Sequence, residues 1–108
     1  MSYKILGQSA PAATTATTLY TCPASTETVV SSVIICNRDA AADSFRIAVR
    51  DGGAALANEH YIAYDVPVGG TDSTALTLGL TLSATDVVTI YAGTANLSFS
   101  LFGTEETV

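Results

Sequence analysis

Few side chains in this sequence could do acid–base or nucleophilic chemistry. His60, in the stretch NEHYIAYD, is the sole histidine among 108 residues, and a histidine that acts as a general base needs an acid or a nucleophile beside it. Glu59 and Asp65 lie at odd spacings from His60, so on a strand both would point to the opposite face. A nucleophile motif such as GxSxG is absent from the sequence. The sequence therefore predicts no catalytic residue and no enzyme activity.

Cofactor and metal sites have no sequence support either. The stretches DGG at 51–53 and GG at 69–70 are followed by no helical pattern and no lysine, which a phosphate-binding loop usually needs. The aspartates are scattered singly and not as the DxDxD runs typical of calcium sites, so we interpret them as turn-capping residues. Cys22 and Cys36 show no CxxC or Cys/His spacing, and we expect both to be buried, unpaired thiols; a disulfide is the alternative. We therefore expect no cofactor and no metal.

The arginines form the most unusual cluster, because three of the four basic residues lie within 36–53. Arg46 and Arg50 are four residues apart, so on a strand both leave the same face, about 13 Å apart at the usual rise per residue. They alternate with Phe45 and Ile47, which we expect to point inward. Arginine is enriched at interfaces, where it pairs with carboxylates. We expect Arg46 and Arg50 to contact carboxylates of another chain; ordinary solvation is the alternative.

Composition limits the partners of the chain. Charged residues make up 13% of it, the net charge is -6, and the mean hydropathy is +0.39. An acidic chain with four basic residues cannot neutralise many phosphates, so we expect no nucleic-acid partner and no membrane surface. No apolar run reaches the 18 residues of a membrane span, and the first residues lack a signal-peptide core, so we expect the chain to stay in the cytoplasm where it is made. High hydropathy with low charge indicates a surface that a partner covers.

Short segments with an alternating apolar and polar pattern predict the fold. They are separated by Gly, Pro, Asn or Asp, which is typical of an all-β sandwich or barrel. We expect a single two-layer antiparallel β-sandwich over 17–108, immunoglobulin-like or jelly-roll in topology. Because the short link GTA separates the last two strands, we expect them to form a hairpin. The expected strands are 17–22, 26–38, 44–50, 60–68, 73–82, 86–93 and 96–103.

The segment 26–38 is apolar on both faces, so we expect it at the centre of its sheet. Strict alternation would place Val29 and Val33 on one face and Val30 and Cys36 on the other.

The first sixteen residues, 1–16, are patterned too poorly for a strand. We expect an extended N-terminal arm that is either flexible or ordered by a neighbour. Tyr3, Ile5 and Leu6 form a small apolar cluster within it, which a partner could cover.

Three long stretches of the sequence resemble a known class of proteins. They contain the phrases LGQSAPAATT, FRIAVR, HYIAYD and LSATDVVT, and together they cover nearly the whole chain. In these phrases the chain resembles small virion structural proteins of tailed bacteriophages, including cyanophages. The resemblance implies a β-rich module that is repeated many times on a virus particle, and it carries no catalytic signature.

We therefore expect a virion structural protein without enzyme activity. The favoured role is a capsid cement or decoration protein, a homotrimer that binds the major capsid protein and bridges neighbouring subunits through many weak contacts. A tail, baseplate or fibre component is the alternative within this class. A host-surface or carbohydrate-binding module is the alternative outside it, since the chain has five tyrosines but no tryptophan to stack on sugars.

Overall fold

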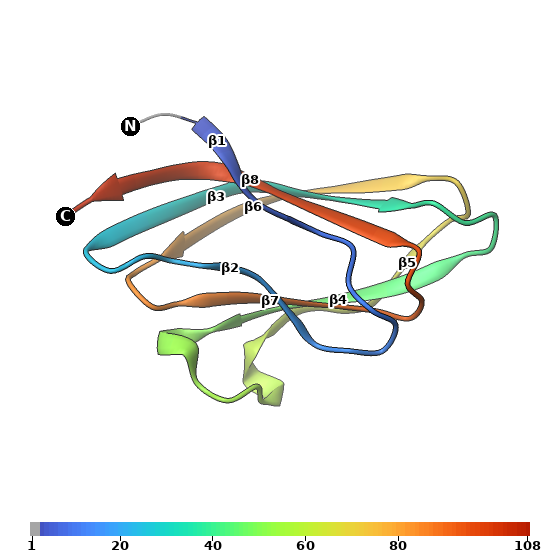
Figure 1. Ribbon diagram of the computed structural model, residues 1–108, viewed down its shortest axis with the longest axis horizontal. Helices are drawn as coiled ribbons and strands as arrows, with labels where there is room; N and C mark the ends of the chain where they lie inside the picture. The colour runs from blue at the N-terminus through green and yellow to red at the C-terminus, as the bar shows by residue number, and fades with distance from the viewer. Residues whose placement is uncertain (1–2) are drawn as a thin grey trace.

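Eight strands and two short 3₁₀ turns make up the fold. The computed structural model describes residues 3–108 (Figure 1). The 3₁₀ turns, Asp51–Gly53 (η1) and Asn58–His60 (η2), both lie between the fourth and fifth strands. The strands are β1 (Tyr3–Ser9), β2 (Thr17–Thr21), β3 (Thr26–Asn37), β4 (Asp43–Arg50), β5 (Tyr61–Val68), β6 (Ser73–Leu82), β7 (Val87–Ala92) and β8 (Leu97–Thr107).

The strands form two antiparallel sheets that pack face to face. Sheet A has the order β1-β8-β3-β6, and sheet B has the order β2-β7-β4-β5. The pairs β4–β5, β3–β6, β2–β7 and β1–β8 are all antiparallel, so the chain is one long ribbon that folds back at its middle and rolls up. An eight-stranded double sheet wound in this way is a jelly roll. The predicted all-β sandwich is confirmed, and the strand order selects the jelly-roll topology.

The core lies between the sheets and consists of aliphatic and aromatic side chains. Phe45 of sheet B and Phe99 of sheet A meet edge to face at its centre, with ring centroids 6.1 Å apart. Each large side chain that is buried here stabilises the fold by about 1.5–3 kcal/mol. Fully buried neighbours are Val30, Val33, Ile35, Ile47, Ile90, Leu97 and Leu101.

A bulge in β3 changes which residues face the core. The strand is central in sheet A, as predicted, but its register against β8 shifts between Val30 and Ser32. An extra residue at a bulge reverses the alternation that follows it, so Val30 and Val33 are both buried. The expected alternation is therefore wrong across the bulge. Cys36 is exposed, which corrects the prediction that both thiols are buried; Cys22 is buried and unpaired as expected.

The expected hairpin between the last two strands is wrong. β7 belongs to sheet B and β8 to sheet A, so the link between them crosses from one layer to the other. Its residues are held by the first residues of β4: Gly93 N–H donates to the carbonyl of Ser44 over 3.1 Å, and the Thr94 hydroxyl donates to Asp43 Oδ2 over 2.5 Å. These bonds hold the link across the end of the sandwich, between the two sheets. A tight hairpin turn would instead have kept β7 and β8 in one sheet.

The expected N-terminal arm is wrong for residues 3–9. These residues form β1, an edge strand that pairs with β8 of the same chain, and residues 1–2 lie outside the described part. Leu6 is partly buried and packs against the core. A methyl group on Gly7 would lie 2.4 Å from the carbonyl oxygen of Leu19, so β1 also closes tightly against sheet B. The sandwich therefore includes residues that the sequence assigned to the arm.

Candidate interaction surfaces

The residues predicted to form an interface do not lie together. Tyr3 and Ile5 lie on the outer face of sheet A with 86% and 54% of their surface exposed, whereas Leu6 points inward. Arg46 and Arg50 leave the outer face of sheet B, on the other side of the molecule. The chain thus presents two different surfaces, one on each sheet.

The outer face of sheet A is nearly free of charge. Val29 and Ile34 join Tyr3 and Ile5 there, with 45% and 38% of their surface exposed. We call this surface the neutral face. Register and alternation assign to it Tyr3, Ile5 and Gln8 of β1, Ser98, Ser100, Phe102 and Thr104 of β8, Val29, Ser32, Ile34 and Cys36 of β3, and Ser73, Ala75, Thr77, Gly79 and Thr81 of β6, and they place Glu27 and Glu106 on the same side of the sheet, at its end.

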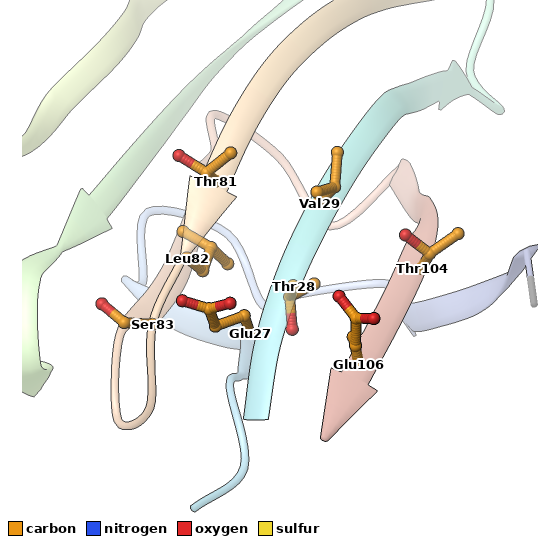
Figure 2. A pocket seen from close by; sticks show the side chains of 8 residues that line it. All are labelled: Glu27, Thr28, Val29, Thr81, Leu82, Ser83, Thr104 and Glu106. Carbon is orange, nitrogen blue, oxygen red and sulfur yellow. The ribbon is translucent and has the colours of Figure 1, made fainter. Parts of the chain in front are cut away.

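A hollow of about 240 Å³ lies at one end of the neutral face (Figure 2). Glu27 and Glu106 line it and stand directly opposite each other in the β3–β8 register. Like charges at opposite positions of a sheet repel each other, and none of the lining residues is basic. The hollow therefore suits a cationic group of a partner. Its other lining residues are Thr28, Val29, Thr81, Leu82, Ser83 and Thr104.

A polar network closes the inside of the sandwich near this end. The Tyr20 hydroxyl lies 2.7 Å from Thr28 Oγ1 and donates to Glu105 Oε2, and Lys4 pairs with the same carboxylate. Burial, together with the hydrogen bond to Glu105, raises the pKa of Tyr20 far above its usual value. The contacts with Lys4 and then Tyr20 lower the pKa of Glu105. The phenol of Tyr20 therefore keeps its proton and the carboxylate of Glu105 keeps its charge. Their hydrogen bonds and the ion pair with Lys4 connect β1, β2, β3 and β8.

Asp86 performs a similar structural role on the other sheet. Its carboxylate accepts hydrogen bonds from the N–H of Gly52 at 2.7 Å and from the N–H of Ser83 at 2.9 Å. Burial alone would raise the pKa of Asp86, but these hydrogen bonds outweigh it and the pKa is lowered. The residue therefore joins η1 to the turn before β7.

Arg46 lies between two tyrosine rings on the outer face of sheet B. Its guanidinium carbon is 4.1 Å from the ring centroid of Tyr64 and 4.3 Å from that of Tyr91. Its Nε donates to Asp65 Oδ1 over 2.7 Å, and this bond raises the pKa of Arg46. Tyr61 packs edge to face on Tyr64, with centroids 5.0 Å apart. We call these five residues the tyrosine–arginine ladder.

A bulge in β5 builds the ladder. Phe45 pairs with Val66 and Ile47 pairs with Ala63, so two residues of β5, Tyr64 and Asp65, oppose Arg46 alone. Asp65 has a φ of 51°, the left-handed conformation that bulged residues often adopt and that aspartate tolerates better than most residues. Because of the extra residue, an aromatic ring and a carboxylate both reach one guanidinium. An alternating pattern in the sequence does not reveal the bulge in β5. The sequence alone therefore could not predict that these five residues lie together.

Arg50, Arg38 and His60 all form hydrogen bonds within the chain. Arg50 donates to Thr89 Oγ1 at 3.0 Å and to the carbonyl of Ala54 at 2.9 Å, so it fastens the loop that follows η1 to sheet B. Arg38 donates to the carbonyl of Ala95. His60 lies in η2, where its Nδ1 accepts from the N–H of Ala57 at 2.9 Å. No cluster of three metal-ligating side chains occurs within residues 3–108.

No protein-family model, curated protein or solved structure matches this chain. In the described part of the chain, no helix has the length and apolar character that a membrane-spanning helix requires.

Proposed function

We propose that the chain is a non-enzymatic structural protein of a bacteriophage virion. In this proposal it is a cement or decoration protein, which binds the outside of the capsid shell through its neutral face and bridges neighbouring copies of the major capsid protein. The observation that carries the proposal is the neutral face itself. Four large apolar side chains are exposed on one sheet, on a chain with a net charge of -6.

Interface physics supports this use of the neutral face. Charged residues are depleted at the centres of protein interfaces, because burying a charge without a partner is costly. Ile5 and Ile34 pair with the uncharged residues Phe102 and Ser100 and can be covered without removing any charge from water, whereas Val29 shares the hollow with Glu27 and Glu106. A basic side chain on the shell would meet the Glu27–Glu106 hollow at the end of the face and fix the direction of docking. Many copies with modest individual contacts would stiffen a shell without chemistry.

A cryo-EM map of the intact virion tests the placement. We expect density for the jelly roll on the outside of the shell, with sheet A toward the capsid protein and three copies grouped together. A particle whose density for this chain lies on the tail, the baseplate or a fibre would overturn the cement role, and its absence from the virion would overturn the whole proposal.

A binding assay tests whether the neutral face is the surface that docks on the shell. Purified shells that lack the protein are incubated with the wild-type chain and with the double variant Ile5→Ser/Ile34→Ser, and bound protein is measured after sedimentation. Docking buries only the part of each side chain that is still exposed, 54% of Ile5 and 38% of Ile34. At about 1.5–3 kcal/mol for a fully exposed side chain, the double variant should weaken binding at least about tenfold. The matched control is Ile62→Ser on sheet B, which removes a similarly exposed isoleucine and should leave binding unchanged. Equal losses in both variants would contradict docking through sheet A.

The oligomeric state can be measured separately. We propose a homotrimer, which would sediment at three times the chain mass of 11.1 kDa. A monomer in solution that becomes trimeric on the shell is consistent with the role; a stable dimer is not.

A further inference from the structure

We propose that the tyrosine–arginine ladder on sheet B is a binding site for a neutral saccharide. The five residues lie in one patch across β7, β4 and β5, on the opposite side of the molecule from the neutral face. This inference does not depend on the virion role, because it concerns the isolated chain.

The ladder has an exposed aromatic surface. Tyr64 has 56% of its surface exposed, although Arg46 stacks on it and Tyr61 packs against it. The apolar C–H face of a pyranose ring stacks on such a ring much as another aromatic group does. A buried tyrosine could not stack on a sugar in this way. Tyr20 is such a residue, because it is buried and its hydroxyl is bonded to Glu105.

The ladder also has unused hydrogen-bonding atoms beside that ring. Among residues 3–108, Arg46 forms its hydrogen bond through Nε and Asp65 accepts through Oδ1. Two guanidinium nitrogens and one carboxylate oxygen therefore remain, and they supply donors and an acceptor on neighbouring groups. Adjacent hydroxyls of a sugar need such a pair, because each hydroxyl can donate one hydrogen bond and accept others.

The charge of the site favours a neutral sugar over an acidic one. The carboxylate of Asp65 already compensates the charge of Arg46 over a distance of 2.7 Å. The whole chain carries a net charge of -6, which repels anions at long range. Nucleic acids and uronic acids are disfavoured by the same field.

The site is held in place before a ligand arrives. The β5 bulge fixes Tyr64 and Asp65 opposite Arg46, and the ion pair and both rings restrict the guanidinium. A preorganised site loses less side-chain entropy on binding. If the neutral face docks on a shell, the ladder points away from it, toward whatever surface the particle meets.

NMR titration of the isolated protein tests the proposal. Labelled protein is titrated with neutral gluco-, manno- and galacto-oligosaccharides and with uronic-acid oligosaccharides of matched length. We expect saturable amide shifts that cluster at Arg46, Tyr61, Tyr64, Asp65 and Tyr91 with at least one neutral series, and weaker or no shifts with the acids. No saturable shift up to about 10 mM of any neutral sugar, well above a weak dissociation constant of 1 mM, would overturn the proposal.

Variants test whether saccharide binding depends on the ladder or is nonspecific. Tyr64→Ala should weaken binding at least tenfold and Asp65→Asn several-fold, while dispersed spectra show that both remain folded. The matched control is Tyr3→Ala, which removes the more exposed tyrosine on sheet A and should leave affinity within a factor of two. Shifts that map to sheet A, equal losses in Tyr64→Ala and Tyr3→Ala, or tighter binding of uronic acids or of an acidic peptide would each contradict a neutral-saccharide site. None of these results depends on whether the neutral face docks on a shell.

Discussion

Replacing Tyr20 by phenylalanine removes one hydroxyl from the inside of the sandwich and leaves the ring in place. That hydroxyl lies 2.7 Å from Thr28 Oγ1 and donates to the Glu105 carboxylate. A hydrogen bond to a charged group contributes about 1.5–3 kcal/mol to stability. Lys4 still pairs with Glu105, and Cys22 Sγ lies 3.2 Å from the Thr28 hydroxyl, so part of the loss is offset. We expect the free energy of unfolding to fall by about 2 kcal/mol at pH 7.

Urea unfolding followed by circular dichroism measures this loss. For a small domain with a slope of about 1–3 kcal/mol/M, the midpoint should fall by about 0.7–2 M. The control is Tyr64→Phe, which removes a hydroxyl from an exposed ring and should leave the midpoint unchanged. Equal midpoints for the two variants would refute the reasoning, because the buried hydroxyl would then contribute no more than an exposed one.

The pH dependence of the same pair of proteins gives a second check. The folded-state pKa of Glu105 is lowered, so its stabilisation is present above its unfolded pKa near 4.3 and is lost as the pH falls through the folded value. The difference between wild type and Tyr20→Phe should therefore shrink in acid. The folded-state pKa of Tyr20 is raised, so the wild type should lose stability as the pH rises above about 10, where an unfolded tyrosine ionises. The Phe variant should lack this alkaline loss.

Three further outcomes follow from single sites. A thiol reagent should label Cys36 in the native protein and Cys22 only after unfolding, since one is exposed and the other buried; two equally fast thiols would contradict the β3 bulge. Asp86→Asn should reduce the free energy of unfolding by about 1–3 kcal/mol at pH 7 and by less below about pH 4, because the lowered pKa of this carboxyl makes its charged form the stabilising one; urea curves at both pH values measure this. Gly103→Ala would place a methyl carbon 2.1 Å from the carbonyl oxygen of Val29 and should lower the melting temperature by at least about 10 °C; an unchanged melt would show that β8 and β3 can separate freely.

Alternation in the sequence predicts the strands well where it is unbroken. In 73–82, leucine occupies the last four inward positions and small or polar residues the outward ones, and β6 has the same bounds. The region 44–50 differs from β4 by one residue. Local pattern suffices in these segments because each strand has one apolar face and a turn residue at each end.

The errors arise where long-range pairing decides the structure. The pattern at 3–9 is weak, yet β1 forms because β8 offers a complete edge for it. The short GTA link predicts a hairpin, but β7 buries five of its six residues in sheet B, and β8 buries Leu97, Phe99 and Leu101 in sheet A. The two bulges that expose Cys36 and assemble the ladder insert one residue each, and a single insertion leaves hardly any trace in an alternating pattern.

The pairing of the first strand with the last also determines at which stage of synthesis and folding the neutral face can form. β4 and β5 are close in sequence and can pair early, whereas Ile5 of β1 pairs with Phe102 of β8, almost a full chain length away. At about 5–20 residues per second, β1 is synthesised about 5–20 s before its partner. Closing such distant pairs is also the slow step in folding of β-rich domains. A chain that stops before β8 lacks the strand between β1 and β3, so sheet A and its outer face cannot form. Only a chain that includes β8 can present that surface.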